Sequence, residues 1–300
     1  MRILLLGKSG QVGWELQRSL AVLGDVTALS RASTEYCGDL SNLSGLVATV
    51  RALRPDLIVN AAAYTAVDKA ESDVQQAQLI NADAPGVLAE EAARLGAPLV
   101  HYSTDYVFNG SGATPWRETD ETGPLSVYGR TKLEGEQRIQ QAGGRHLIFR
   151  TSWVYAARGG NFAKTMLRLA RERERLTVID DQFGAPTGAD LLADVTAQAI
   201  SQALKRAEIN GVFHLAASGE TNWHAYAKYV IDYAKSARNA LDFAVKEVAA
   251  IPSSAFPLPA PRPFNSRLDT TKLRTTFGLN LPQWQQGVAR MLDEILGEPS

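Results

Sequence analysis

Short, mostly apolar runs alternate with longer amphipathic segments along the first half of the chain. Such runs are typical of strands that are buried on both faces of a parallel sheet. The expected strands are Ile3–Leu6, Val26–Leu29, Leu57–Ala61, Leu99–Tyr102 and Leu147–Phe149. Apolar residues at helical spacing predict helices between them, over Val12–Leu23, Leu43–Leu53, Ala82–Leu95 and Leu125–Gln141. This alternation predicts an α/β fold, a doubly wound parallel sheet of the Rossmann type, over residues 1–150.

The pattern becomes less regular after residue 150. The expected helices are Phe162–Glu172, Ala189–Lys205, Trp223–Ala237 and Trp284–Leu296, and the expected short strands are Leu176–Ile179, Gly211–Leu215 and Val245–Ala249. Five prolines between Pro252 and Pro263 exclude a regular helix there, which leaves an ordered extended segment or a loose surface loop. We expect residues 151–300 to form mainly a smaller, interleaved C-terminal lobe that binds substrate, with some segments returning to the first domain.

Composition and charge narrow the possible partners. The chain has 300 residues, 45% hydrophobic and 21% charged, with a formal net charge of −1, so neither nucleic acid nor an anionic membrane is an expected partner. Cys37 is the only cysteine, which excludes an internal disulfide and fits a reducing compartment. No segment approaches the roughly 20 apolar residues of a membrane span, and the first residues do not resemble a secretory signal. A cytoplasmic protein with a small-molecule substrate is expected.

Three glycines follow the first expected strand and open the first helix. Gly7, Gly10 and Gly13 stand where a dinucleotide site needs a tight turn, a close approach of backbone to pyrophosphate, and close helix–strand packing. The helix N-terminus also offers free N–H groups to the phosphates, through residues such as Gln11 and Val12. A glycine triplet alone can be a plain turn, but its place between strand and helix predicts dinucleotide binding.

The residues after the second expected strand bear on the choice of cofactor. NAD-selective sites carry an acid there, whereas this chain has Ser30 and Arg31, which suit a 2′-phosphate. NADPH is therefore expected and NADH remains possible; a solvated loop arginine is the alternative interpretation of Arg31. Further candidate cofactor contacts at the ends of neighbouring loops are Asp39, Leu40, Ala62, Ala63 and Tyr64.

A phenol and an ammonium group lie four residues apart on one expected helix. Tyr128 and Lys132 share a helix face, and a nearby cation favours the phenolate, which brings a pKa of about 10 closer to neutrality. Ser103 and Thr104 supply hydroxyl groups at the end of the fourth strand. A Tyr-x-x-x-Lys pair also occurs by chance on surface helices, but here it lies between the fourth and fifth strands of a dinucleotide-binding pattern.

The glycine loop, the hydroxyl after the fourth strand and the Tyr-x-x-x-Lys pair together resemble the extended short-chain dehydrogenase/reductase family. Other segments resemble members that reduce a 4-keto deoxysugar carried on dTDP. These segments are residues 7–16, 59–71, 102–108, 127–132, 150–155, 181–187 and 262–273. They cover the chain nearly from end to end, and the combination is far more specific than any one motif.

The resemblance implies a role for each candidate site residue. Tyr128 is the proton donor, Lys132 orients the nicotinamide ribose and lowers the tyrosine pKa, and Thr104 polarises the substrate carbonyl; Tyr128 and Lys132 thus also contact the cofactor. Asp105 and Trp153 match positions that hold the deoxysugar, although core packing is an alternative for Trp153. The implied reaction is hydride transfer from NADPH to the C4 keto group of the sugar.

Three other functions occur on related folds and are alternatives to this one. Related sugar-nucleotide dehydratases carry Thr-Asp-Glu where this chain has Thr104, Asp105 and Tyr106, so elimination lacks its second carboxylate. A 4-epimerase with retained NAD remains an alternative. A non-catalytic dinucleotide-binding regulatory subunit is disfavoured because the catalytic residue types are present.

The resemblance also implies a homodimer and a possible role for Mg²⁺. Glu15 matches an acidic position linked to that metal, and Asp190 and Glu294 are further candidates. The sequence contains no recognisable set of octahedral oxygen ligands, so ordinary surface carboxylates are the favoured interpretation and the metal ligands stay unassigned.

Overall fold

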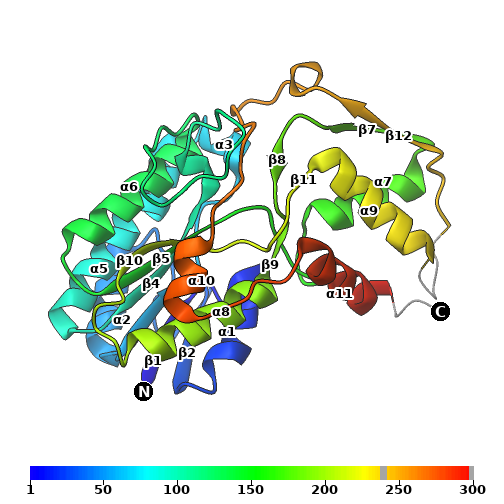
Figure 1. The fold of residues 1–300 in the computed structure, drawn as a ribbon. Helices are drawn as coiled ribbons and strands as arrows, with labels where there is room; N and C mark the ends of the chain where they lie inside the picture. The colour runs from blue at the N-terminus through cyan, green and yellow to red at the C-terminus, as the bar shows by residue number, and fades with distance from the viewer. Residues whose placement is uncertain (237–241, 297–300) are drawn as a thin grey trace.

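The computed structural model describes residues 1–236 and 242–296, and its larger part is built around one parallel sheet (Figure 1). Six strands lie in the order β2-β1-β3-β4-β5-β10, and every neighbouring pair is parallel. Their bounds are β1 (Arg2–Leu6), β2 (Asp25–Leu29), β3 (Leu57–Asn60), β4 (Leu99–Thr104), β5 (His146–Thr151) and β10 (Gly211–His214). This arrangement confirms the predicted doubly wound α/β sheet.

Helices cover both faces of the sheet because successive residues of each strand point to opposite faces, and the residues on both faces are apolar. Ile3 and Leu5 of β1 pack in one core cluster with α1 (Gln11–Leu20) and α8 (Ala189–Ala203). Leu4 and Leu6 pack in the other, against α2 (Leu43–Leu53), α5 (Ala84–Leu95) and α6 (Val127–Gln141). The four side chains are at most 1% exposed. Burial on both faces is the physical reason for the continuous apolar runs in the sequence.

The smaller part of the molecule is a helical lobe beside the sheet domain (Figure 1). Helices α7 (Phe162–Glu172), α9 (Trp223–Ser236) and α11 (Trp284–Leu296) share one apolar cluster. Short strand pairs accompany them: β6 (Val154–Tyr155) with β9 (Thr187–Gly188), β8 (Phe183–Gly184) with β11 (Thr221–Asn222), and β7 (Arg175–Ile179) with β12 (Glu247–Ile251). The expected helix Trp223–Ala237 agrees with α9 except for Ala237, which lies outside the described residues.

The chain passes repeatedly between the two parts. After β9 it returns to the sheet domain as α8 and β10, and α10 (Thr271–Phe277) packs against both. The proline-rich segment, residues 252–263, begins with a short 3₁₀ turn, η3 (Ser253–Ala255), and runs back from β12 to the sheet domain. Segments far apart in the sequence therefore meet along the carboxyl edge of the sheet.

The predicted helix boundaries moved where local geometry intervened. The expected helix Ala82–Leu95 begins as α5 at Ala84, because Leu79–Asp83 form a π-helical turn, η1, and a proline occupies the first turn of α5. Two short helices, α3 (Val67–Ala70) and α4 (Val74–Gln78), precede that turn. A 3₁₀ turn, η2 (Asp105–Val107), follows β4. Such turns lie at the carboxyl edge, where regular structure gives way to the site.

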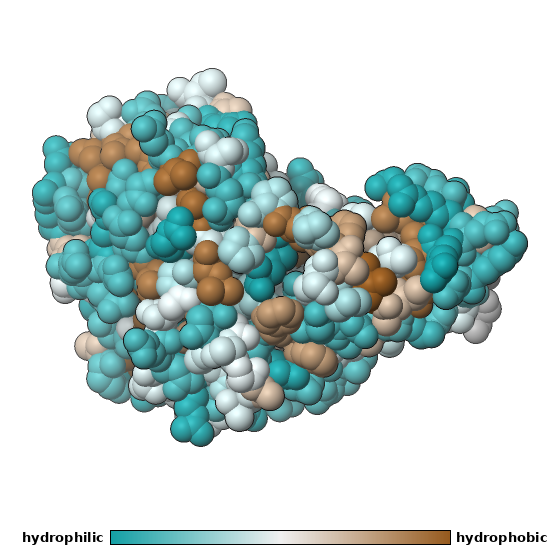
Figure 2. All heavy atoms as spheres, turned by 90° about the horizontal axis from the view of Figure 1, so that it is seen from above, coloured by the Kyte–Doolittle hydropathy of each residue, from teal (hydrophilic) through white to brown (hydrophobic). Residues whose placement is uncertain are grey.

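Across the described residues, no helix is both long and apolar enough to cross a membrane. Figure 2 shows the molecule from above, with hydrophilic side chains over most of that face and apolar side chains in small separate groups. Scattered apolar residues of this kind are ordinary on a protein surface.

Candidate active site

The glycine loop is shaped by contacts that leave no room for side chains. Gly7 directly follows β1 with φ +92°, and a Cβ there would lie 2.7 Å from the backbone nitrogen of Ala62. A Cβ on Gly13 would lie 2.0 Å from the carbonyl oxygen of Gly7. Gly10 is the N-cap of α1, and no side chain caps the helix there. The uncapped N–H groups at the start of α1 and the close-packed glycines fit the pyrophosphate of a dinucleotide.

This loop lies at the point where the strand order reverses. The connection from β1 runs outward to β2 through α1 on one face of the sheet, whereas the connection from β3 runs the other way to β4 through α5 on the opposite face, so a crevice opens between β1 and β3 at the carboxyl edge. The carbonyl oxygen of Leu29, at the end of β2, accepts hydrogen bonds from the N–H groups of Gly7 and Lys8 at 2.9 and 3.1 Å. Ser30 and the exposed Arg31 follow Leu29 directly, so the structure places them beside the glycine loop.

The other candidate cofactor contacts lie on the neighbouring loops. The Asp39 carboxylate accepts hydrogen bonds from the N–H and hydroxyl of Ser41 at 3.0 and 2.8 Å, which ties it to its own turn. Leu40 is 4% exposed and packs in the core, which leaves its backbone to contact a ligand. Ala62, Ala63 and Tyr64 follow β3, and the Tyr64 hydroxyl donates to Asp73 at 3.0 Å.

Thr104 and Tyr128 meet at the carboxyl end of β4. Thr104 is the last residue of β4, and Tyr128 lies in the first turn of α6, which Ser126 caps by accepting from Gly129 N–H. The Thr104 hydroxyl donates to Asp105 at 3.0 Å, and its hydrogen bond to Tyr128 lowers the tyrosine pKa. Burial has the larger and opposite effect and raises the pKa of Tyr128 to about 12. The expectation that the neighbouring cation brings this pKa toward neutrality is therefore wrong for the chain without cofactor.

Lys132 is directed toward β4. Its Nζ donates to the carbonyl oxygen of Tyr102 at 2.5 Å and lies 3.1 Å from His101 Nε2. Lys132 is only 2% exposed, and this burial lowers its pKa to about 8, against the smaller effect of the Glu136 carboxylate. Tyr128 and Lys132 do lie on one helix, but the lysine reaches the strand beneath it. Sequence reasoning missed His101; its only signal was a histidine inside a buried strand.

Asp105 is a buried carboxyl group that directly follows β4. It is 2% exposed, and burial raises its pKa to about 6 although hydrogen bonds with the Ser266 and Thr104 hydroxyls lower it. Tyr106 follows it, and the Tyr106 ring meets the Tyr128 ring edge-on, with centroids 5.6 Å apart. Aromatic packing therefore occupies the position where a related dehydratase carries its second carboxylate.

Trp153 has an unusual backbone and a tight aromatic neighbour. Its φ of +48° lies in the left-handed region, which is costly for a bulky residue. The half-buried indole stacks on Trp223 with centroids 3.7 Å apart, and a Cβ at position 184 would lie 2.8 Å from its ring. Trp223 in turn donates from Nε1 to Gln182 at 3.2 Å. The lobe thus holds Trp153 in one orientation at the carboxyl edge.

An ion pair fastens the proline-rich segment over the same edge. Both guanidinium ends of Arg262 donate to the Asp68 carboxylate of α3, at 2.9 and 2.8 Å, and the Ala260 N–H adds a third hydrogen bond. The Arg262 guanidinium lowers the pKa of Asp68. The local sequence indicates no role for either residue, since nothing in it relates positions so far apart.

The acidic residues proposed for a metal do not form a site within one chain. Glu15 pairs with Arg18 at 3.5 Å, and Asp190 lies 3.6 Å from Arg290. Glu294 lies on α11. Residues 1–236 and 242–296 contain no group of three or more His, Cys, Asp or Glu side chains placed to hold a metal ion. The carboxylates therefore do not fit an octahedral Mg²⁺ site in the single chain.

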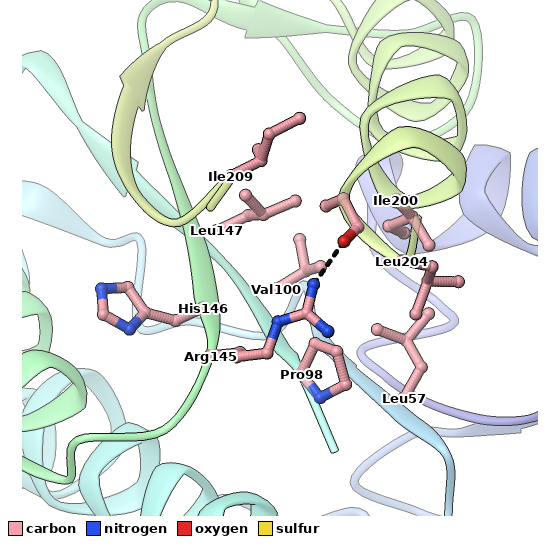
Figure 3. Close-up of a pocket in the computed structure, with 10 residues that line it drawn as sticks. Leu57, Pro98, Val100, Arg145, His146, Leu147, Ile200, Leu204 and Ile209 are labelled. Atoms are coloured by element: carbon pink, nitrogen blue, oxygen red, sulfur yellow. Dashed lines mark hydrogen bonds between the residues drawn. The ribbon is translucent and has the colours of Figure 1, made fainter. Parts of the chain in front are cut away.

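A small pocket lies at the opposite, amino edge of the sheet (Figure 3). Leu57, at the start of β3, and His146, at the start of β5, are among the residues that line it, and Arg145 donates to the carbonyl oxygen of Ala203 across it. Its volume is about 10 Å³, which is room for about one water molecule. This pocket is too small for a substrate and is far along the strands from the glycine loop.

The Rossmann sheet, the glycine loop and the Thr104–Tyr128–Lys132 group define an enzyme of the extended short-chain dehydrogenase/reductase class. Within that class, the chain belongs to the family described as RmlD substrate binding domain, whose model matches residues 1–296. It is 60% identical to a dTDP-4-dehydrorhamnose reductase of Salmonella typhimurium over 295 residues, 98% of each chain.

Solved structures agree with this assignment. A dTDP-4-dehydrorhamnose reductase of Clostridium acetobutylicum superposes with a TM-score of 0.89 at 34% identity, over 98% of this chain and 99% of the other. A dTDP-4-dehydrorhamnose reductase of Bacillus anthracis, in complex with NADP, gives 0.86 at 32% identity, with the same coverage of both chains.

Proposed function

We propose that the protein is a dTDP-4-dehydrorhamnose reductase. It reduces the C4 keto group of dTDP-4-dehydro-L-rhamnose with NADPH and forms dTDP-L-rhamnose. The observation that carries the proposal is 60% identity to a reductase of that name over 98% of both chains, in a chain that retains Thr104, Tyr128 and Lys132 at the crevice. A relative crystallised with NADP supports the choice of cofactor.

The glycine loop and the loop after β2 would hold the cofactor. Gly7, Gly10 and Gly13 admit the pyrophosphate to the start of α1, and Ser30 with Arg31 bind the 2′-phosphate. When bound there, NADPH supplies the hydride that reduces the sugar carbonyl. Arg31 is exposed beside the glycine loop, where its guanidinium is free to turn toward a phosphate.

Two residues of the chain act on the substrate oxygen, and a third acts on the tyrosine. Tyr128 has a pKa of about 12 in the cofactor-free protein, so it is protonated at neutral pH and available as the proton donor. With substrate bound, the Thr104 hydroxyl would donate its single proton to the carbonyl oxygen instead of to Asp105, and so stabilise the developing negative charge there. A charged Lys132 stabilises the tyrosinate that remains after proton transfer.

The lobe would bind the sugar against these groups. Trp153 supplies a flat apolar face at the carboxyl edge, and Asp105 accepts or donates hydrogen bonds to sugar hydroxyls. We assign residues 1–150 mainly to cofactor binding and residues 151–300 mainly to substrate binding, with α8, β10 and α10 returning to the sheet.

The decisive experiment follows NADPH absorbance and the sugar product together, with dTDP-4-dehydro-L-rhamnose as substrate. A reductase consumes one NADPH for each sugar reduced. Isomerised sugar formed without NADPH consumption would instead identify a 4-epimerase. Binding of dinucleotide without turnover of a panel of 4-keto sugar nucleotides would identify the regulatory subunit.

Two further proposals concern the assembly, which rests on the family resemblance, and the location, which does not. We propose a homodimer, which light scattering at working concentration tests; a monomer at all concentrations would contradict it. We also propose a cytoplasmic location, supported by the single cysteine and by use of a reducing nicotinamide carrier. Fractionation of the source cells tests it.

A further inference from the structure

A buried row of polar side chains crosses the sheet beneath the proposed site. Asn60 at the end of β3, His101 in β4 and Lys132 in α6 are 0%, 1% and 2% exposed. Asn60 Nδ2 lies 3.2 Å from His101 Nδ1, and His101 Nε2 lies 3.1 Å from Lys132 Nζ. The imidazole therefore connects the end of β3, which borders the glycine loop, with the lysine.

Asn60 determines which nitrogen of His101 carries the proton. The Asn60 Oδ1 accepts the N–H of Ala62 at 3.1 Å, so the amide turns its NH₂ group toward His101. An NH₂ group only donates, and Nδ1 must therefore accept. In a neutral imidazole the single proton is then on Nε2, which faces Lys132. Burial, together with the nearby Lys132, lowers the pKa of His101 well below its ordinary value, so the ring is neutral.

The two charge states of Lys132 respond differently to this N–H. An uncharged amine accepts a hydrogen bond from Nε2–H and still donates to the carbonyl oxygen of Tyr102. An ammonium group has no lone pair, so its hydrogens meet the donor at 3.1 Å without a hydrogen bond. A hydrogen bond from the ammonium group to Nε2 forms only if the imidazole proton moves to Nδ1. Asn60 must then turn its amide, which breaks its hydrogen bond with the Ala62 N–H. The network as built thus opposes the charge on Lys132.

We propose that His101 is a positioning residue for Lys132: held in one tautomer by Asn60, it presents an N–H to the lysine nitrogen and so sets the pH at which Lys132 gains its charge. Sequence motifs of the family assign the lysine but not this control of its charge. The consequence for catalysis, that the tyrosinate is stabilised only below that pH, rests on the proposed function.

Other ionisable groups on the packed elements also act on Lys132. Besides His101, the Glu136 carboxylate of α6 acts on it, and Tyr102 of β4 contacts it through the backbone carbonyl oxygen, while the Tyr102 hydroxyl bonds Thr196 of α8. The Glu136 carboxylate raises the lysine pKa, but burial lowers it further, to about 8. Glu136 is itself neutralised by Arg150, which donates to it at 2.9 and 2.6 Å in the interior.

Substitution of His101 by Gln reverses the polarity of the contact. A glutamine reaches the position of Nε2, and its carbonyl oxygen accepts from an ammonium group. We expect the alkaline limb of kcat/KM to move up by about one pH unit in H101Q, the shift that one charge-assisted hydrogen bond produces. The matched control is H146Q, a buried histidine at the amino end of β5 that hydrogen-bonds Gly144 instead. Its alkaline limb should equal that of the wild type.

A second measurement uses the protein without cofactor or substrate. The pKa of Lys132 is about 8 in the folded chain and about 10.4 when unfolded, so the unfolded chain binds more protons between these values. Because of Lys132, the free energy of unfolding therefore increases as pH rises above about 8. Denaturant titrations at pH 7.5–9.5 measure this increase. In H101Q the gain should begin about one unit higher, while H146Q keeps the wild-type profile.

A third variant covers the case in which H101Q does not fold. In N60D the carboxylate still accepts from Ala62 and draws the imidazole proton to Nδ1, which leaves Nε2 to accept from the ammonium. The same upward shift is expected. Unshifted kinetic and stability profiles in the folded variants would overturn the proposal. A protein with no reductase activity but with shifted stability profiles would contradict the proposed function and support the role of His101.

Discussion

The indole ring of Trp153 lies face to face on that of Trp223, with centroids 3.7 Å apart. The first residue follows β5 and the second begins α9, so the stack joins the carboxyl edge of the sheet to the helical lobe. Phe162 of α7 packs against Trp223 from the lobe, with ring centroids 4.6 Å apart. The aromatic residues hold Trp153 in its left-handed backbone conformation. A strained residue supported in this way is typical of a ligand site.

Trp153→Ala should raise KM for the keto-sugar by about tenfold, because an aromatic face contributes on the order of 1 kcal/mol beyond its area. Cofactor affinity should change by less than twofold. Steady-state kinetics with varied sugar and a separate NADPH titration measure both. Trp223→Phe keeps an aromatic support and should raise KM less. A Trp153 variant that melts far below the wild type yet keeps a normal KM would assign the residue to packing alone.

Tyr128→Phe should lower kcat by at least about 100-fold, since general acid catalysis contributes about 10²- to 10⁴-fold. The phenylalanine ring retains the edge-on contact with Tyr106, so NADPH affinity should stay within threefold. Single-turnover kinetics and fluorescence titration of the cofactor provide the two readouts. Activity close to that of the wild type would remove Tyr128 from the mechanism.

Arg31→Ala should weaken NADPH by about ten- to a hundredfold and leave NADH nearly unchanged, because only NADPH carries the 2′-phosphate. The exposed side chain makes no contribution to the core, so the melting temperature should not move. Titration of the wild type and the variant with both cofactors measures the two affinities, and NADH serves as the internal control. Equal losses for the two cofactors would return Arg31 to the solvated-loop interpretation.

Asp105→Asn should remove the contribution of this carboxyl group to the pH dependence of the free energy of unfolding. The folded pKa of Asp105 is about 6, above the value of about 3.9 in an unfolded chain, so the folded state binds more protons between these values. The wild type therefore loses stability from this residue as pH rises from about 4 to about 6, by on the order of 1–3 kcal/mol. Denaturant titrations across this window should show a smaller loss in the variant. Parallel curves would mean that the carboxyl group ionises normally.

The sheet could be predicted because its evidence is local. Continuous apolar runs identified β1, β3, β4 and β5, and helical spacing identified α2 and α7 to the residue. The alternation of strand and helix then predicted a parallel, doubly wound sheet. The glycine loop was recognised for the same reason, since its three glycines and the strand before them are adjacent in sequence.

Interactions between distant segments could not be predicted in this way. The pairing of β10 with β5, the Asp68–Arg262 ion pair and the Trp153–Trp223 stack join residues more than 60 positions apart, and no local pattern encodes them. The spacing of Tyr128 and Lys132 placed both on one helix face, but the direction in which each pKa shifts depended on how deeply α6 packs on β4. Burial and hydrogen-bond geometry determine these pKa values, and both exist only in the folded chain. The sequence alone therefore determined the fold class and the chemical groups of the site, and the tertiary structure decided which charge each of those groups carries.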